Sequence, residues 1–186
     1  VICTIAMYDE VRNWNRNNIE KYMNLYKEWC QSVKRKKQSI VIPYVSAYGY
    51  TEEIAQEIKK GIESSNFDVD ILMYNLVTAD MNEFLSDINQ CSGLLLGSPT
   101  LLSDTLPQIW TILTSLNPVI HKGLSASCFG SYGWSGEAVP RIESRLKELR
   151  MKMPLESLSV NFKPSEEELK KAFEYGKGIQ GSVSFK

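Results

Sequence analysis

The sequence predicts an α/β protein with a five-stranded parallel sheet, doubly wound into a three-layer αβα sandwich and preceded by an extra helix. Two observations predict this architecture. Short apolar runs alternate strictly with amphipathic helical patterns from residue 39 to about 180, which is typical of right-handed βαβ crossovers. The first run, Ser39–Ser46, is rich in β-branched residues and bounded by turn signals, as expected of a strand buried on both faces.

The remaining elements continue this alternation. Strands are expected at residues 39–46, 68–74, 93–97, 124–130 and 155–162, and helices at 51–64, 81–90, 106–116, 136–150 and from 165 onward. Asp80 with Glu83 gives the second of these helices a start signal, and Ser165 with Glu168 forms a capping box before the last one. Ligands of such sheets bind beyond the carboxyl ends of the strands, so we expect a site in the loops there.

The segment before the sheet divides the chain in two. Residues 17–30 carry an amphipathic helical pattern with a capping box of Asn17 and Glu20. The basic run at residues 34–37 follows, and we interpret it as a solvated linker. We therefore expect an N-terminal helical segment and linker at 1–38 and one α/β domain at 39–186. Because the chain starts at Val1 without an initiator methionine, we also expect it to be part of a longer protein.

Composition and charge exclude several classes of function. Lys and Arg number 21 and Asp and Glu 22, so the net charge of −1 gives no attraction to nucleic acid or to an anionic membrane. No apolar run is long enough to span a membrane and no secretion signal is visible, so we expect a soluble, cytoplasmic protein. The four cysteines are widely spaced, which favours reduced thiols over a zinc site.

The loop after the first strand, Ser46–Thr51, opens directly into a helix. Hydroxyl groups and a glycine at a helix N-terminus favour a phosphate, because unpaired N–H groups and the helix dipole attract an anion there. The loop lacks the lysine of a nucleoside-triphosphate loop and the three glycines of a dinucleotide fingerprint. It therefore suits a lone phosphate monoester. The alternative is that Ser46 and Thr51 only cap the helix.

Two further loops would meet the first at the same edge of the sheet. Gly97–Asp104 follows the third strand, and its proline can fix a loop that presents backbone groups to a flat heterocycle. The alternative for this loop is a plain turn. Gly130–Gly136 follows the fourth strand and places Tyr132 and Trp134 among three glycines. Exposed aromatics favour cover by a planar ring system such as isoalloxazine; the alternative is that Trp134 packs on the adjacent helix or on a partner subunit.

Together these motifs resemble those of a known family. The Ser-x-Tyr-Gly-x-Thr of the first loop, the Gly-Ser-Pro-Thr of the second with the Leu-Pro-x-x-Trp after it, and the Gly-Ser-Tyr-Gly-Trp-Ser-Gly-Glu-Ala of the third look like the flavodoxin domain of flavodiiron proteins, also called A-type flavoproteins. The resemblance covers residues 39–180. It implies a flavodoxin-like fold that binds FMN, with the phosphate in the first loop and the isoalloxazine between the other two.

The resemblance also implies which residues bind the cofactor. Sixteen positions match the family's three motifs: Ser46, Ala47, Tyr48, Gly49, Tyr50, Thr51, Ser98, Pro99, Thr100, Leu101, Leu102, Ser131, Tyr132, Gly133, Trp134 and Gly136. No catalytic residue and no metal ligand is implied for this chain.

The sequence departs from the family pattern in two places. Leu102 stands where the family commonly has asparagine, which removes a polar contact to the flavin edge. The opening segment is similar to the end of the family's diiron domain, but Ala6 and Met7 stand where an iron-ligating His-Gly turn would be. The only histidine is His121, for which we expect a solvated or capping role. One histidine cannot build a carboxylate-histidine site, so no diiron centre is expected in this chain.

The function that the resemblance implies is electron transfer, in which FMN relays electrons from a reduced donor to a partner redox centre. That partner would be a diiron domain reducing oxygen or nitric oxide, reached across a head-to-tail homodimer. Two alternatives stay open. One is an FMN-dependent NAD(P)H:quinone reductase, which shares the fold and a similar phosphate loop. The other is a flavodoxin-fold binding module that has lost FMN, which Leu102 and the missing histidine motivate.

Overall fold

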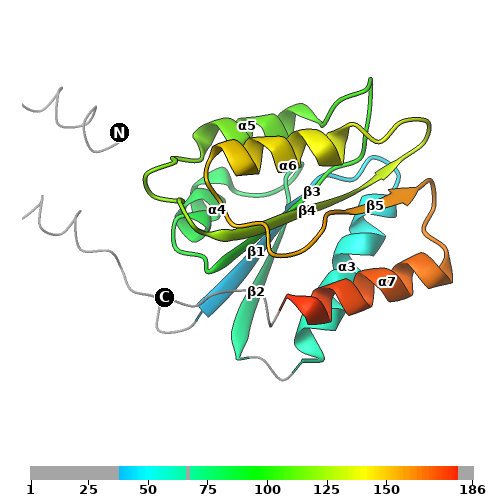
Figure 1. Ribbon diagram of the computed structural model, residues 1–186, viewed down its shortest axis with the longest axis horizontal. Coiled ribbons are helices and arrows are strands. Elements are labelled where there is room, and N and C mark those ends of the chain that lie inside the picture. Colours follow the sequence, from blue (N-terminus) through cyan, green and yellow to red (C-terminus); the bar gives the residue numbers. More distant parts are fainter. Residues whose placement is uncertain (1–37, 66–67, 180–186) are drawn as a thin grey trace, which may run out of the picture. The chain divides into compact units, whose positions relative to one another are not determined.

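The structure is a computed structural model that describes residues 38–65 and 68–179 (Figure 1). Its sheet contains five parallel strands: β1 (Gln38–Tyr44), β2 (Val69–Asn75), β3 (Gly93–Gly97), β4 (Ser125–Tyr132) and β5 (Leu158–Asn161). They lie in the order β2-β1-β3-β4-β5, which is that of flavodoxin-like folds. The doubly wound, five-stranded sheet predicted from the sequence is confirmed.

The five helices formed by the described residues cover the sheet in two layers (Figure 1). They are α3 (Tyr50–Glu63), α4 (Met81–Ile88), α5 (Pro107–Ser115), α6 (Ala138–Glu148) and α7 (Glu166–Gly178). The first and last pack on one face and the other three on the opposite face. The predicted start signals are confirmed, because Asp80 caps α4 and Ser165 forms a capping box with Glu168 at α7.

Alternate residues of each strand supply the two cores. In β3, Leu94 and Leu96 belong to the core under α4, α5 and α6, whereas Leu95 belongs to the core under α3 and α7. β1 divides in the same way, with Val41 on the first side and Ile40 on the second. All five side chains are at most 3% exposed. Burying one such side chain contributes about 1.5–3 kcal/mol, so the sheet is held firmly from both faces.

Helices α3 and α7 cross at a pair of glycines. A Cβ atom added at Gly61 would lie 2.0 Å from the backbone oxygen of Phe173, and one added at Gly176 would lie 2.1 Å from that of Ile58. The two backbones therefore approach more closely than any side chain would allow. This contact fixes α3, whose first turn faces the carboxyl ends of the strands.

Some predicted boundaries shift. β4 continues to Tyr132 instead of ending at residue 130, because its pairing with β5 extends to Asn161. β5 is shorter than predicted, and β1 ends at Tyr44 rather than Ser46. The predicted helix at 17–30 lies outside the described residues, and Gln38, which the predicted boundary assigns to the linker, is the first residue of β1.

His121 precedes β4, and the prediction that it is solvated is wrong. It is 4% exposed, and its Nδ1 lies 3.0 Å from both the backbone N and the backbone O of Asn117. Burial lowers the pKa of the imidazole. The side chain therefore closes the turn after α5, which agrees with the capping role that was the other expectation.

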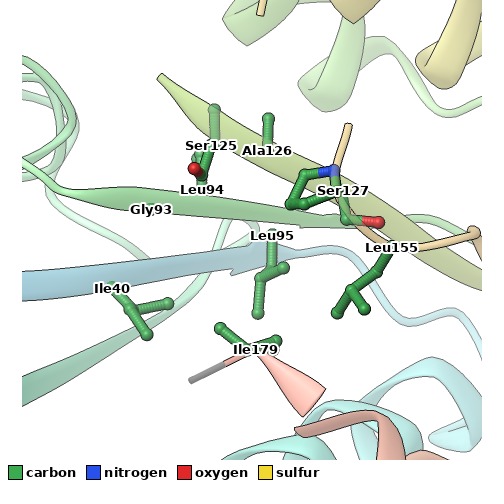
Figure 2. A pocket seen from close by; sticks show the side chains of 10 residues that line it. Ile40, Gly93, Leu94, Leu95, Ser125, Ala126, Ser127, Leu155 and Ile179 are labelled. Atoms are coloured by element: carbon green, nitrogen blue, oxygen red, sulfur yellow. The ribbon is translucent and has the colours of Figure 1, made fainter. Parts of the chain in front are cut away.

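Near the amino end of the sheet, apolar side chains of the described residues leave a gap of about 10 Å³ beside the start of β3 and β4. Figure 2 shows Leu95, Leu155 and Ile179 among these side chains. This is room for about one water molecule, and the surrounding surface is apolar. Among the described residues, no helix is long and apolar enough to cross a membrane.

Candidate functional site

A cleft opens at the opposite end, beyond the carboxyl ends of the strands. It encloses about 420 Å³, within the range of about 300–1,000 Å³ that small-molecule sites occupy. Its walls come from the loops after β1, β3, β4 and β5, and none of the lining residues is a carboxylate, an amine or an imidazole: Tyr48, Tyr50, Pro99, Thr100, Leu101, Leu102, Ser103, Ser131, Tyr132, Gly133, Trp134, Ser135 and Phe162.

The first wall is the loop between β1 and α3. Gly49 occupies the N-cap position of α3 in a left-handed conformation, φ 86°, and itself offers no side-chain cap. The backbone N–H of Glu52 in the first turn donates to Ser46 Oγ over 3.4 Å, which is long for a hydrogen bond. Ser46 is therefore a weak cap, as the alternative expects, whereas the Thr51 hydroxyl contacts Ser131 instead. A helix start without a cap at its N-cap position suits an anion.

Thr51 connects the first wall to the third. Its side chain is buried, and its Oγ1 lies 2.9 Å from Ser131 Oγ near the end of β4. The contact spans 80 residues of sequence. A shift of either loop would therefore be transmitted to the other.

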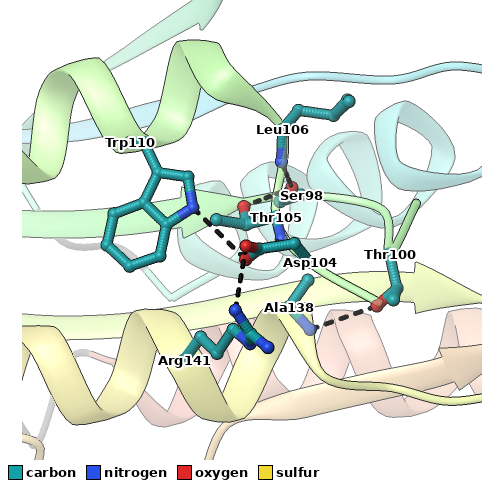
Figure 3. A network of polar contacts seen from close by, with 8 residues as sticks. All are labelled: Ser98, Thr100, Asp104, Thr105, Leu106, Trp110, Ala138 and Arg141. Carbon is teal, nitrogen blue, oxygen red and sulfur yellow. Dashed lines mark hydrogen bonds and ion pairs between the residues drawn. The ribbon is translucent and has the colours of Figure 1, made fainter. Parts of the chain in front are cut away.

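Ser98 shapes the second wall from within. It is fully buried, and its Oγ accepts hydrogen bonds from Thr105 Oγ1 at 2.7 Å and from the backbone N–H of Leu106 at 3.3 Å. The backbone oxygen of Ser98 lies 2.0 Å from where a Cβ atom of Gly130 would stand. The loop is therefore pinned both to α5 and to β4, while Thr100 Oγ1 accepts from the N–H of Ala138 at the start of α6 (Figure 3).

The turn that follows carries backbone strain. Leu101 and Asp104 exchange two backbone hydrogen bonds of 3.0 Å, and Leu102 and Ser103 between them have φ of 52° and 58°. Two positive φ values are typical of a type I′ turn, which favours Asn and Gly. Leucine and serine cost more there, about 1 kcal/mol each. The leucine side chain is fully exposed.

Asp104 fastens this turn to two helices (Figure 3). Its Oδ1 accepts from the Thr105 N–H at 2.7 Å and from Trp110 Nε1 on α5 at 3.2 Å. Its Oδ2 accepts from Arg141 Nη1 on α6 at 2.8 Å. One carboxylate therefore neutralises a cation and holds the strained turn in place.

The third wall is the end of β4 and the turn after it. Ser131 and Tyr132 belong to the strand rather than to the loop. Trp134 is 95% exposed, and its ring meets that of Phe162 edge to face, with centroids 6.1 Å apart. Of the two alternatives for Trp134, packing on the adjacent helix is not what the structure shows.

Ten of the sixteen predicted positions line the cleft. The other six lie around it: Ser46, Ala47, Gly49, Thr51, Ser98 and Gly136. Sequence reasoning missed Ser103, Ser135 and Phe162. The first two are neighbours of predicted residues, and only their place in the loops could have indicated them. Phe162 could have been found by the rule used for the other loops, since it directly follows the last strand.

Comparisons with known proteins agree with this geometry. A model of the family described as flavodoxin matches residues 42–176. The chain is 39% identical over 158 residues to flavo-diiron protein FprA2 of Clostridium acetobutylicum, covering 85% of this chain and 40% of that protein. It is 30% identical to the anaerobic nitric oxide reductase flavorubredoxin of Escherichia coli, covering 88% of this chain and 34% of that protein.

Solved structures give the same picture. The flavodiiron core of Flv1 from Synechocystis sp. PCC6803 superimposes with a TM-score of 0.71 at 26% identity, over 89% of this chain and 41% of that one. A flavodoxin from the domain Archaea superimposes with a TM-score of 0.67 at 27% identity, over 78% of this chain and 99% of that one. Domains of this kind bind FMN. This chain spans about two fifths or less of the length of the curated relatives named above.

The residues present fit FMN. At one end of the cleft, the start of α3 has no side-chain cap at its N-cap residue Gly49, and its backbone N–H groups can donate to a phosphate. At the other end, Leu102 and Trp134 leave apolar surface in water, which a flat ring system would cover. The uncharged walls between them suit a neutral ring.

Proposed function

The chain belongs to the flavodoxin family, and from this premise we propose that it is an FMN-binding electron-transfer module of the flavodiiron type. The single observation that carries the proposal is the cleft. It combines the start of α3, whose N-cap Gly49 provides no side-chain cap, with an uncharged, partly aromatic wall. When bound there, FMN would supply transfer of one or two electrons through its ring.

The phosphate end would be formed by the first loop. We propose that Ser46, Ala47, Tyr48, Gly49, Tyr50 and Thr51 hold the phosphate, chiefly through backbone N–H groups and the Ser46 hydroxyl. No lysine or arginine lines the cleft, so the phosphate charge would be stabilised by dipoles and hydrogen bonds alone. Thr51 would act through Ser131, its hydrogen-bond partner.

The ring end would be formed by the other two predicted loops. Pro99, Thr100 and the turn at Leu101 and Leu102 would lie along one edge of the ring. Tyr132, Gly133 and Trp134 would cover a face of it. Ser98 and Gly136 lie behind these walls, where they would set the backbone path. The lining holds no carboxylate, amine or imidazole, so we assign no proton transfer to a side chain of this site.

The length of the relatives supports a proposal about the redox partner. Since the chain spans about two fifths or less of those proteins, we propose that electrons pass to a diiron domain or another redox partner outside residues 39–186, in a head-to-tail homodimer. That partner would reduce oxygen or nitric oxide. We further propose that the N-terminal segment, predicted at residues 1–38, forms a unit separate from the FMN domain, apart from Gln38, which belongs to β1.

The proposed compartment is the cytoplasm. Cys128 is a free thiol, and free thiols persist in a reducing compartment. Burial raises the pKa of Cys128 to about 12, so this thiol stays protonated and unreactive at neutral pH.

The proposal is tested by adding FMN to the purified full chain and removing unbound flavin by gel filtration. We expect retained flavin absorption at close to one FMN per chain. A chain that stays colourless would contradict the proposal and favour a binding module without cofactor. Steady oxidation of NAD(P)H by the loaded chain alone, without a partner protein, would instead favour a quinone reductase.

Two variants at one position sharpen the test. Gly49→Asp places a carboxylate at the helix start, where it would occupy the backbone donors and repel the phosphate. Gly49→Asn is the matched neutral control, since both residues tolerate a positive φ. We expect the aspartate variant to bind FMN at least about tenfold more weakly than the asparagine variant, in line with the roughly 1.5–3 kcal/mol of hydrogen bonds to charged groups.

A further inference from the structure

Backbone strain in the described residues is concentrated at the cleft. In the described part of the chain, four residues other than glycine have a positive φ: Leu102, Ser103, Arg150 and Phe162. Three of the four line the cleft, and only Arg150 does not. Strained backbone conformations persist only where the surrounding structure holds them in place, and they cluster at functional sites. Phe162 belongs to none of the three predicted loops.

Phe162 has the left-handed conformation with the bulkiest side chain of the four. Its φ is 55°, and a bulky residue in this region is a true outlier. The position is fixed by its backbone N–H, which donates to the Tyr132 oxygen over 2.7 Å. This bond extends the pairing of β4 and β5 by one residue and turns the phenyl ring back towards the cleft.

The ring of Phe162 has a bare backbone on one side and Trp134 on the other. It lies 3.3 Å from where a Cβ atom of Gly133 would stand, so a side chain at that position would press against the ring. Its plane meets the indole of Trp134 at 64° with 6.1 Å between centroids, an edge-to-face geometry that aromatic pairs prefer. Both side chains keep more than half of their surface exposed.

We propose that Phe162 is a positioning residue of the cofactor site, which holds the indole of Trp134 at the mouth of the cleft. The loop after β5 is then a fourth wall of the site. The inference rests on the proposed function, because it assigns to Trp134 a face of the bound ring. It explains why a strained, half-exposed phenylalanine stands where glycine or asparagine would be easier to accommodate.

The test measures the dissociation constant of FMN for the full chain and its variants. Phe162→Leu keeps the apolar bulk but removes the ring, whereas Phe162→Tyr keeps the ring. We expect the leucine variant to bind FMN two- to tenfold more weakly, the range that one aromatic pair contributes. The tyrosine variant should remain within twofold of the wild type. Phe173→Leu on α7 is the matched control and should change nothing.

A double-mutant cycle with Trp134→Ala separates positioning from direct contact. If Phe162 acts through Trp134, Phe162→Leu should have no further effect in the Trp134→Ala background. Near-ultraviolet circular dichroism of the chain without FMN should show the same loss in Phe162→Leu as in Trp134→Phe. This spectroscopic change does not depend on the cofactor.

The outcomes distinguish the two claims. If the wild type binds FMN but Phe162→Leu binds it equally well, the inference is wrong and the proposed function stands. Effects that add in the double variant would also overturn positioning, since Phe162 would then act independently. A wild type that binds no FMN contradicts the proposed function and the inference together.

Discussion

The two ends of the sheet differ in what they leave open. At the amino end, apolar side chains close around a gap of about 10 Å³. At the carboxyl end, the same strands diverge into loops around about 420 Å³. Three left-handed residues other than glycine line the open end, while Arg150 lies in the segment that leads into β5. The amino end stabilises the fold by apolar packing, whereas the carboxyl end carries strained residues around an open site.

The largest effect is expected at the closed end. Ile40→Ala removes a fully buried side chain beside the gap, and such a change costs about 2–5 kcal/mol of unfolding free energy. Urea unfolding monitored by circular dichroism measures this cost. FMN affinity of the folded fraction should be unchanged. A matching loss of affinity would show that the two ends are not independent.

A slightly smaller effect is expected at the open end. Gly130→Ala would place a Cβ atom 2.0 Å from the Ser98 backbone oxygen, and relieving such an overlap costs about 1–3 kcal/mol. Because the oxygen belongs to the second wall, FMN affinity should fall as well. Gly178→Ala on α7 is the control, since its Cβ atom would lie 3.7 Å from Leu155, an ordinary contact, and the residue does not line the cleft. Equal affinities of these two variants would contradict the role of Gly130.

Alkaline pH should destabilise the open end of the sheet. Burial, with the hydrogen bond to Glu52, raises the pKa of Tyr44 to about 12. Because the folded pKa lies above the unfolded value of about 10, this contribution to stability is complete below pH 10 and is lost as the pH rises through about 12. Tyr44→Phe should make unfolding free energy fall less steeply over this interval. An identical slope in both proteins would contradict the assignment.

The smallest effects are expected from relieving backbone strain, once at the rim of the cleft and once away from it. Leu102→Gly and Arg150→Gly each relieve a left-handed residue, which should raise the unfolding free energy by about 1 kcal/mol or less. Only Leu102→Gly should weaken FMN binding, because Arg150 does not line the cleft. Equal FMN affinities in both variants would show that the Leu102 side chain has no part in the site.

The sequence allowed the sheet to be predicted because its signal is local. Apolar runs such as Gly93–Gly97 and caps such as Asp80 act over a few residues. The end of β4 could not be predicted in this way, because its last two residues are strand only through pairing with β5. The same holds for Ser98, whose hydroxyl looked available in sequence but is buried against Thr105 and Leu106.

Phe162 shows the other limit of prediction. Its residue type and its place at a strand end were visible, but its left-handed backbone and its contact with Trp134 result from tertiary structure. The motif resemblance covers three loops and does not include the loop after β5. Residues that act on a site through a neighbour carry no motif of their own.

The hydrogen bond between Trp110 and Asp104 has a practical consequence. It couples an intrinsic fluorophore to the carboxylate that fastens the strained turn. Indole emission shifts when its N–H changes partner, so a chain that keeps Trp110 as its sole tryptophan would carry an optical gauge of that turn. Nanosecond lifetimes and stopped-flow traces could then report the state of this turn while flavin is added, with no added label.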